Sequence, residues 1–129
     1  MAAEPFQYAI LRVVPRVERG ERINVGVVLF CRTRRYLDSR ASLTEPRSGI
    51  LRALAPDIDL GAIDAHLAVI AAIVRGDPSA GPLAGLAQPE RFRWITSPSS
   101  TVIQPSEVHT GLTDDPGATL DQIFATQVA

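Results

Sequence analysis

Two neighbouring stretches near the N-terminus have the apolar patterns of paired β-strands. The stretch FQYAILRVV at 6–14 is rich in aromatic and β-branched residues and is stopped by Pro15. At 22–31, a stretch that contains INVGVVLFC has apolar residues on both faces, as in an interior strand covered on two sides. Gly26 interrupts this second stretch and indicates a bulge or a close backbone approach, with a packing role. We therefore predict that the two stretches pair as an antiparallel hairpin in the middle of a sheet.

Helical spacing is clearest at 60–75 and 116–127, where apolar residues recur every three or four positions along one face. Each segment follows an acidic residue that can cap a helix N-terminus: Asp57 or Asp59 for the first and Asp115 for the second. A shorter helix is predicted from Pro46, which suits a first helical position, to Pro56. His66 has no metal-ligand partner four residues on, so we interpret it as a packed or solvated histidine.

Four further segments have weaker patterns. The mixed polarity at 34–43 is compatible with a third strand. Arginine alternates with aromatic residues in RFRWITS at 91–97, which predicts another strand, and 100–105 is its expected partner in a second hairpin. The segment 76–89 is rich in glycine, proline and alanine, so we interpret it as a flexible connection.

Together these elements predict an α+β fold, in which an antiparallel sheet built on the N-terminal hairpin packs against two or three helices. The chain has 129 residues, 46% of them hydrophobic and 21% charged, which favours a single domain over 1–129. Its only cysteine, Cys31, rules out an internal disulfide. No apolar run approaches the roughly 18 residues of a membrane span, and the N-terminus has an acid where a signal peptide carries basic residues. We expect a cytoplasmic protein that does not bind a membrane.

All thirteen cationic side chains are arginine. The absence of lysine excludes P-loop, Schiff-base and kinase chemistry, because each needs an ammonium group. Nine arginines against four acids lie within 12–47, so this part has an excess of five positive charges, although the whole chain has a net charge of −1. No GxGxxG, nucleophile elbow or cysteine pair with metal spacing occurs, and we expect no cofactor.

The turn of the predicted hairpin, RVERGERIN, is the first candidate site because it gathers alternating charges around a glycine. Its candidate residues for binding a ligand or a partner are Arg16, Glu18, Arg19, Glu21 and Asn24. Solvated ion pairs worth about 0 to 1 kcal/mol each are one interpretation. Arginine forks held by glutamates also suit a phosphate or carboxylate, and the same charges suit a protein partner. Asn24 is polar within an apolar strand, so it either fixes the turn or faces a site.

The segment SEVHTGLTDD at 106–115 is the second candidate site, with His109, Thr110 and Asp114 as its residues. Together with Asp115, these side chains suit a general base and acids, or a weak metal site of one histidine and two carboxylates. No metal is expected, because helix capping explains Asp115 and the field of a helix N-terminus explains Asp114. His109 is expected in a loop between two ordered elements. We hypothesise that the charged hairpin turn lies beside His109 and Thr110 and that the two segments recognise one anionic group.

A third candidate site is the arginine-rich segment CRTRRYLDSR. Its residues for contacting nucleic-acid phosphates and stacking on a base are Arg32, Arg34, Arg35, Tyr36 and Arg40. A solvated edge strand is the alternative interpretation. The sequence pI of about 6.1 argues against a dedicated nucleic-acid binder but is compatible with one that uses this single patch.

Two segments, YAILRVVPRVERGERINVGVVLFC and RFRWITSPSSTVIQPSEVHTGLTDDPGATLDQIF, closely resemble the bacterial family called domain of unknown function 3037. The ERGE turn of the hairpin and the HTG segment before an acidic helix start are the family signature, while 40–88 carries little of the likeness. The resemblance implies no established activity. It implies a partner, because members are often encoded beside kinases resembling HipA.

Two functions remain open. The first is a non-catalytic adaptor or regulatory module that binds a protein partner, such as a HipA-like kinase, or an anionic ligand. This function predicts an exposed apolar or arginine-rich patch. The second is a small enzyme or nucleic-acid processing factor that uses His109 and the charged turn, which predicts that both segments meet at one concave pocket. The residues alone do not decide whether the protein is an enzyme.

Overall fold

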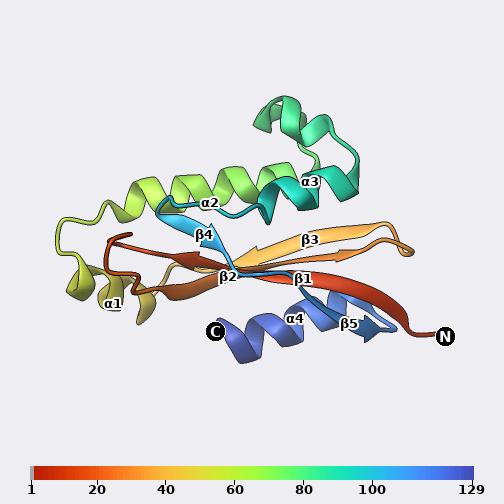
Figure 1. The fold of residues 1–129 in the computed structure, drawn as a ribbon, viewed down its shortest axis with the longest axis horizontal. Coiled ribbons are helices and arrows are strands. Elements are labelled where there is room, and N and C mark those ends of the chain that lie inside the picture. Colours follow the sequence, from red (N-terminus) through yellow and green to blue (C-terminus); the bar gives the residue numbers. More distant parts are fainter. Residues whose placement is uncertain (1) are drawn as a thin grey trace.

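The sheet is built on the predicted N-terminal hairpin. In the computed structural model, which describes residues 2–129, β1 (Glu4–Val13) pairs antiparallel with β2 (Ile23–Cys31), and β3 (Tyr36–Ala41) pairs antiparallel with β2. Two short strands lie along the other side of β1 and pair antiparallel with it (Figure 1). They are β4 (Ile103–Pro105), beside the end of β1, and β5 (His109–Thr113), beside its beginning. The hairpin, the third strand and the α+β class are confirmed.

The register of the hairpin shifts near the end of β1. Leu11 lies opposite Gly26, whereas the next residue, Arg12, lies opposite Asn24, so β2 contains a one-residue bulge. A Cβ atom on Gly26 would lie 2.9 Å from the backbone oxygen of Arg40 on β3. Gly26 therefore marks both a bulge and a close backbone approach, and its role is packing.

Helices cover both faces of the sheet. Figure 1 shows α2 (Leu60–Arg75) and α3 (Gln88–Ile95) on one side and α4 (Pro116–Gln127) on the other. Apolar residues of β2 alternate between the two cores, and every residue from 25 to 31 is buried. The core on the α4 side contains Phe6, Ile10, Val27, Leu29, Cys31, Leu120, Phe124 and Val128. The prediction of an interior strand covered on two sides is confirmed.

Local signals set the helix boundaries. The side chain of Asp59 accepts a hydrogen bond from the amide of Ala62 at 3.0 Å, and that of Asp115 accepts one from Ala118 at 3.1 Å. A shorter helix, α1 (Arg47–Leu54), follows β3 in the chain, as predicted. The segment 76–89 contains two 3₁₀ turns, η1 (Pro78–Ala80) and η2 (Pro82–Gly85), before α3 begins. No helix formed by residues 2–129 combines the length and the apolar character that crossing a membrane requires.

The predicted second hairpin is wrong. Residues 88–95 form α3 instead of a strand, and β4 pairs with β1. Pro89 stands in the first turn of α3, where its missing N–H costs no hydrogen bond. Phe92 and Ile95, three positions apart, pack against the sheet, whereas Trp94 points outward. The alternation of arginine with aromatic residues therefore misled the prediction, because a segment this short fits both the two-residue period of a strand and the 3.6-residue period of a helix.

Candidate functional site

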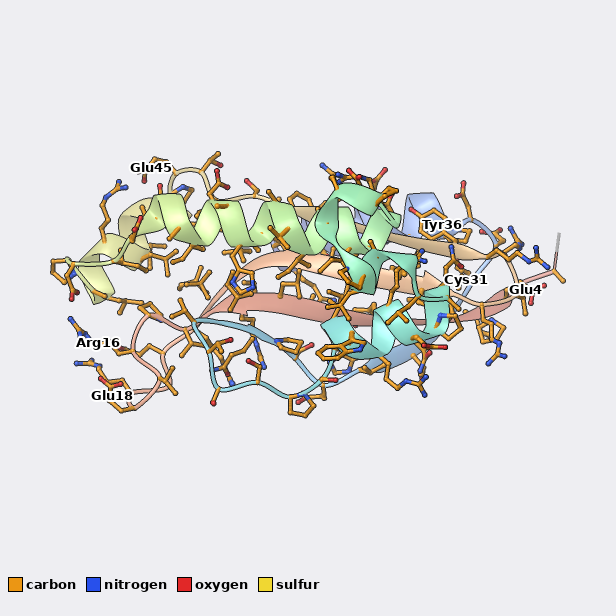
Figure 2. All side chains as sticks on the ribbon, turned by 90° about the horizontal axis from the view of Figure 1, so that it is seen from above. Glu4, Arg16, Glu18, Cys31, Tyr36 and Glu45 are labelled. Carbon is orange, nitrogen blue, oxygen red and sulfur yellow. The ribbon has the colours of Figure 1, made fainter. Side chains whose placement is uncertain are left out.

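The charged hairpin turn lies at one end of the sheet. Figure 2 places Arg16 and Glu18 at the end of the molecule opposite Glu4, where β1 begins. Arg19 and Glu21 form an exposed ion pair with 2.8 Å between Nε and Oε1. Arg16 donates from Nη2 to Oδ1 of Asp57 at 3.1 Å, which links the turn to the loop before α2. The turn therefore uses part of its charge in ion pairs.

Asn24 holds three elements together. Its side-chain Nδ2 donates to the backbone oxygen of Gln127 at 3.0 Å, at the end of α4. Its own backbone oxygen accepts a hydrogen bond from Nε of Arg47 on α1 at 2.9 Å. Of the two predicted roles, these contacts favour the structural one, in which Asn24 fixes the surroundings of the turn.

The structure places His109 in strand β5, so the prediction that it lies in a loop is wrong. His109 is opposite Tyr8 on β1, with ring centroids 5.2 Å apart, and Thr110 is opposite Gln7. The segment was mistaken for a loop because its pairing partner lies a hundred residues earlier in the chain. Asp114 follows the strand, and its backbone oxygen accepts a hydrogen bond from Nη1 of Arg34 at 3.1 Å.

The two candidate segments lie at different ends of β1. His109 pairs with Tyr8, whereas the turn begins only after Val13. Five residues of extended strand span about 16 Å at roughly 3.3 Å per residue. The structure therefore does not bring the charged turn and His109 together around one small anionic group.

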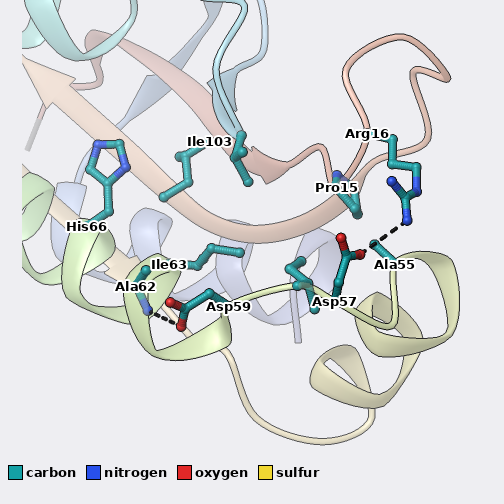
Figure 3. Close-up of a pocket in the computed structure, with 11 residues that line it drawn as sticks. Pro15, Arg16, Ala55, Asp57, Asp59, Ala62, Ile63, His66 and Ile103 are labelled. Atoms are coloured by element: carbon teal, nitrogen blue, oxygen red, sulfur yellow. Dashed lines mark hydrogen bonds and ion pairs between the residues drawn. The ribbon is translucent and has the colours of Figure 1, made fainter.

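Arg16 instead lines a cavity of about 390 Å³ between the turn, α2 and β4, the turn cavity (Figure 3). Its apolar lining comes from Pro15, Ala55, Ile58, Ala62, Ile63, Val102 and Ile103. The polar lining consists of Arg16, Asp57, Asp59 and His66. From the sequence, Asp57 or Asp59 was expected to cap the helix, and His66 was expected to be a packed or solvated histidine. The missed signal was that His66 and the capping Asp59 are seven residues apart, two turns along one helix face.

Most polar groups of the turn cavity already interact with other groups of the protein. Arg16 is paired with Asp57, and Oδ1 of Asp59 accepts the capping hydrogen bond from Ala62. His66 forms no hydrogen bond with either aspartate, so the three side chains do not make a linked base and acid. Among residues 2–129, no group of three or more His, Cys, Asp or Glu side chains is arranged to hold a metal ion. The cavity can bind a polar or cationic group but lacks free positive charge for an anion.

A more apolar groove of about 200 Å³, the Trp94 groove, shares His66 with the turn cavity and follows α2 toward α3. Its rim includes Trp94, with 59% of its surface exposed, and Val69, with 48% exposed. Its other apolar lining residues are Leu11, Ile70, Ile73, Ile95, Ile103 and Pro105. The sequence prediction missed this groove because it placed Trp94 in a strand. The three-residue spacing of Phe92 and Ile95, with Pro89 ahead, was the signal for a helix that turns Trp94 outward.

Internal contacts occupy much of the predicted nucleic-acid patch. Arg40 pairs with Asp121 at 2.9 Å and lies 4.3 Å over the ring of Phe124. Arg34 donates to the backbone oxygens of Asp114 and Ala2. Tyr36 packs against the α4-side core, and burial, followed by nearby carboxylates, raises the pKa of its phenol. Arg32 and Arg35 are the two patch residues whose side chains form no such contact within 2–129.

The fold and these cavities define a small α+β protein that presents several shallow grooves around a two-sided sheet. The chain belongs to the family described as protein of unknown function (DUF3037), whose model matches residues 8–128. The match includes the middle of the chain, 40–88, which carries little of the likeness that the sequence motifs show. No curated protein and no solved structure matches the chain.

Proposed function

We propose that this protein is a non-catalytic adaptor or regulatory module that binds a protein partner through the Trp94 groove. The observation that supports this function is the exposure of Trp94 and Val69 together on the rim of an apolar groove. An exposed tryptophan beside an apolar groove has the chemistry of a binding hot spot, because aromatic anchors contribute a large share of interface energy. Clustered exposed apolar residues of this kind mark interaction surfaces more often than isolated ones.

The same geometry disfavours the small-enzyme alternative. That function requires the charged turn and His109 to meet at one pocket, and the register of β1 separates them. A HipA-like kinase in the bacterial cytoplasm is the first partner to test, because the family resemblance suggests it. Affinity purification from the native host provides the unbiased list of partners.

The test is partner binding by variants of the groove rim. We expect Val69→Asp and Trp94→Ala each to weaken binding at least tenfold, about 1.4 kcal/mol, because each removes an exposed apolar contact from the proposed interface. Isothermal titration calorimetry against the purified partner measures the dissociation constants. Because Trp94 is the only tryptophan, its fluorescence reports docking directly in the unmodified protein.

Ile50→Asp is the matched control, since Ile50 on α1 is an equally exposed helical residue, at 44%, outside the groove. Its binding should equal that of the unmodified protein. Unchanged affinity in both rim variants, with an unperturbed fold, would show that the partner binds elsewhere.

A further inference from the structure

A second groove lies on the side of α3 away from the Trp94 groove. It is near the beginning of β1 and the end of β2. This arginine groove encloses about 310 Å³. It is lined by residues of β1, of β2 and the turn after it, of α3 and its C-cap, and of the segment before β5: Gln7, Phe30, Arg32, Pro89, Phe92, Arg93, Thr96 and Val108. Four separate parts of the chain therefore build it.

The floor of the arginine groove is apolar and aromatic. The rings of Phe30 on β2 and Phe92 on α3 lie 5.4 Å apart between centroids, and both side chains are otherwise buried. Pro89 and Val108 extend this apolar surface on either side. An apolar group seated here contacts mainly Pro89 and Val108, which is 38% exposed, and only the small exposed part of the two rings, 5% of each residue.

The rim carries positive charge without a counter-charge. Arg32 and Arg93 are both exposed, and no carboxylate lines the groove. Within residues 2–129 neither guanidinium takes part in an ion pair, whereas Arg16, Arg19, Arg40 and Arg52 each pair with a carboxylate. Glu90, one turn before Arg93 on α3, forms no ion pair with it. In the turn cavity, by contrast, the guanidinium of Arg16 already forms an ion pair with Asp57.

We infer that the arginine groove is a binding site for a small organic acid, with its carboxylate held by Arg32 and Arg93 and its aromatic or apolar body on the Phe30 and Phe92 floor. Guanidinium forks bind carboxylates through paired, charge-assisted hydrogen bonds. Gln7 adds an uncharged amide at the rim that can fix orientation. The volume lies at the lower end of the range for ligand pockets, about 300 to 1,000 Å³, which fits a single-ring acid.

The experiment is an NMR titration of the full chain with 3-phenylpropionate, using its uncharged analogue 3-phenylpropionamide as the matched ligand. We expect saturable amide shifts confined to the groove residues and at least tenfold weaker binding of the amide. Arg32→Gln and Arg93→Gln should each weaken binding of the acid at least fivefold, and the double variant should abolish it. Arg22→Gln is the control, because Arg22 is also exposed and in no ion pair but lies in the hairpin turn.

Equal affinity for acid and amide, shifts centred elsewhere, or full binding by the double variant would overturn the proposal. An end-blocked acidic hexapeptide tested in parallel separates a free acid from a partner's acidic side chain, and tighter binding of the peptide would also overturn it. The inference does not rest on the proposed function. Trp94→Ala should weaken partner docking at least tenfold and leave 3-phenylpropionate binding intact.

Discussion

At the scale of single residues, Tyr36 links burial to a pH-dependent stability. Burial, with smaller effects from the carboxylates of Asp38, Asp121 and Asp115, raises the pKa of its phenol in the folded protein. An unfolded tyrosine has a pKa of about 10, so the folded state holds this proton more tightly. The corresponding stability is complete below pH of about 10 and is lost as the pH rises through the folded-state pKa. We expect the free energy of unfolding to fall over this range.

The measurement is urea unfolding at a series of pH values, for the unmodified protein and for Tyr36→Phe. The phenylalanine variant has no phenol to ionise, so its free energy of unfolding should fall less steeply above pH of about 10. Identical slopes for the two proteins would mean that Tyr36 does not carry this dependence.

At the scale of elements, the pairing of β5 with β1 depends on Gly111. Gly111 lies opposite Phe6, and a Cβ atom at this glycine would lie 2.7 Å from Cε1 of the buried Phe6 ring. Gly111→Ala therefore forces the ring or the strand to move. We expect the free energy of unfolding to fall by about 1 to 3 kcal/mol, the usual cost of overpacking a core. Chemical denaturation measures it.

Gly85→Ala is the control for the change of glycine to alanine itself. No atom beyond Gly85 and its two neighbours in the chain lies within 4 Å of the position that a Cβ would take there, and its φ is not positive. This variant should be neutral or slightly stabilising, because alanine restricts the unfolded chain. A loss at Gly111 no larger than the change at Gly85 would contradict the close approach to Phe6.

At the scale of the whole molecule, the sheet separates cores that should respond independently to mutation. Ile10 belongs to the core on the α4 side, whereas Ile63 belongs to a cluster on the α2 side. Each substitution to valine should cost about 0.5 to 1.5 kcal/mol. Because the two side chains share no cluster, the double variant should lose the sum of the two costs within about 0.5 kcal/mol. Guanidinium unfolding of the four proteins completes the cycle.

A second cycle within one cluster provides the comparison. Ile63 and Ile103 pack in the same cluster, so Ile63→Val and Ile103→Val should couple. Strong coupling between Ile10 and Ile63, as large as that within the cluster, would show that the sheet transmits packing changes from one face to the other.

The sequence alone determined the elements whose signals are local. The hairpin follows from β-branched runs on either side of a charged turn. Helices α2 and α4 follow from apolar periodicity after a capping aspartate: Asp57 or Asp59 for α2, of which the structure selects Asp59, and Asp115 for α4. These signals act between residues close in the chain, so neighbouring residue types suffice to predict them. The family resemblance likewise rested on contiguous motifs, and the match over 8–128 confirms it.

Only the tertiary structure decided which side chains share a surface. The segment 88–95 fits the residue period of a strand and that of a helix. The helix forms because it allows Phe92 and Ile95 to pack together against the sheet. Likewise, pairing with β1 makes a strand of the segment that holds His109 and sets it apart from the charged turn. Arg32 and Arg93 line one groove only because α3 packs against β2 and β3. Such contacts join residues distant in sequence, and they depend on the packing of complete elements, which no local pattern specifies.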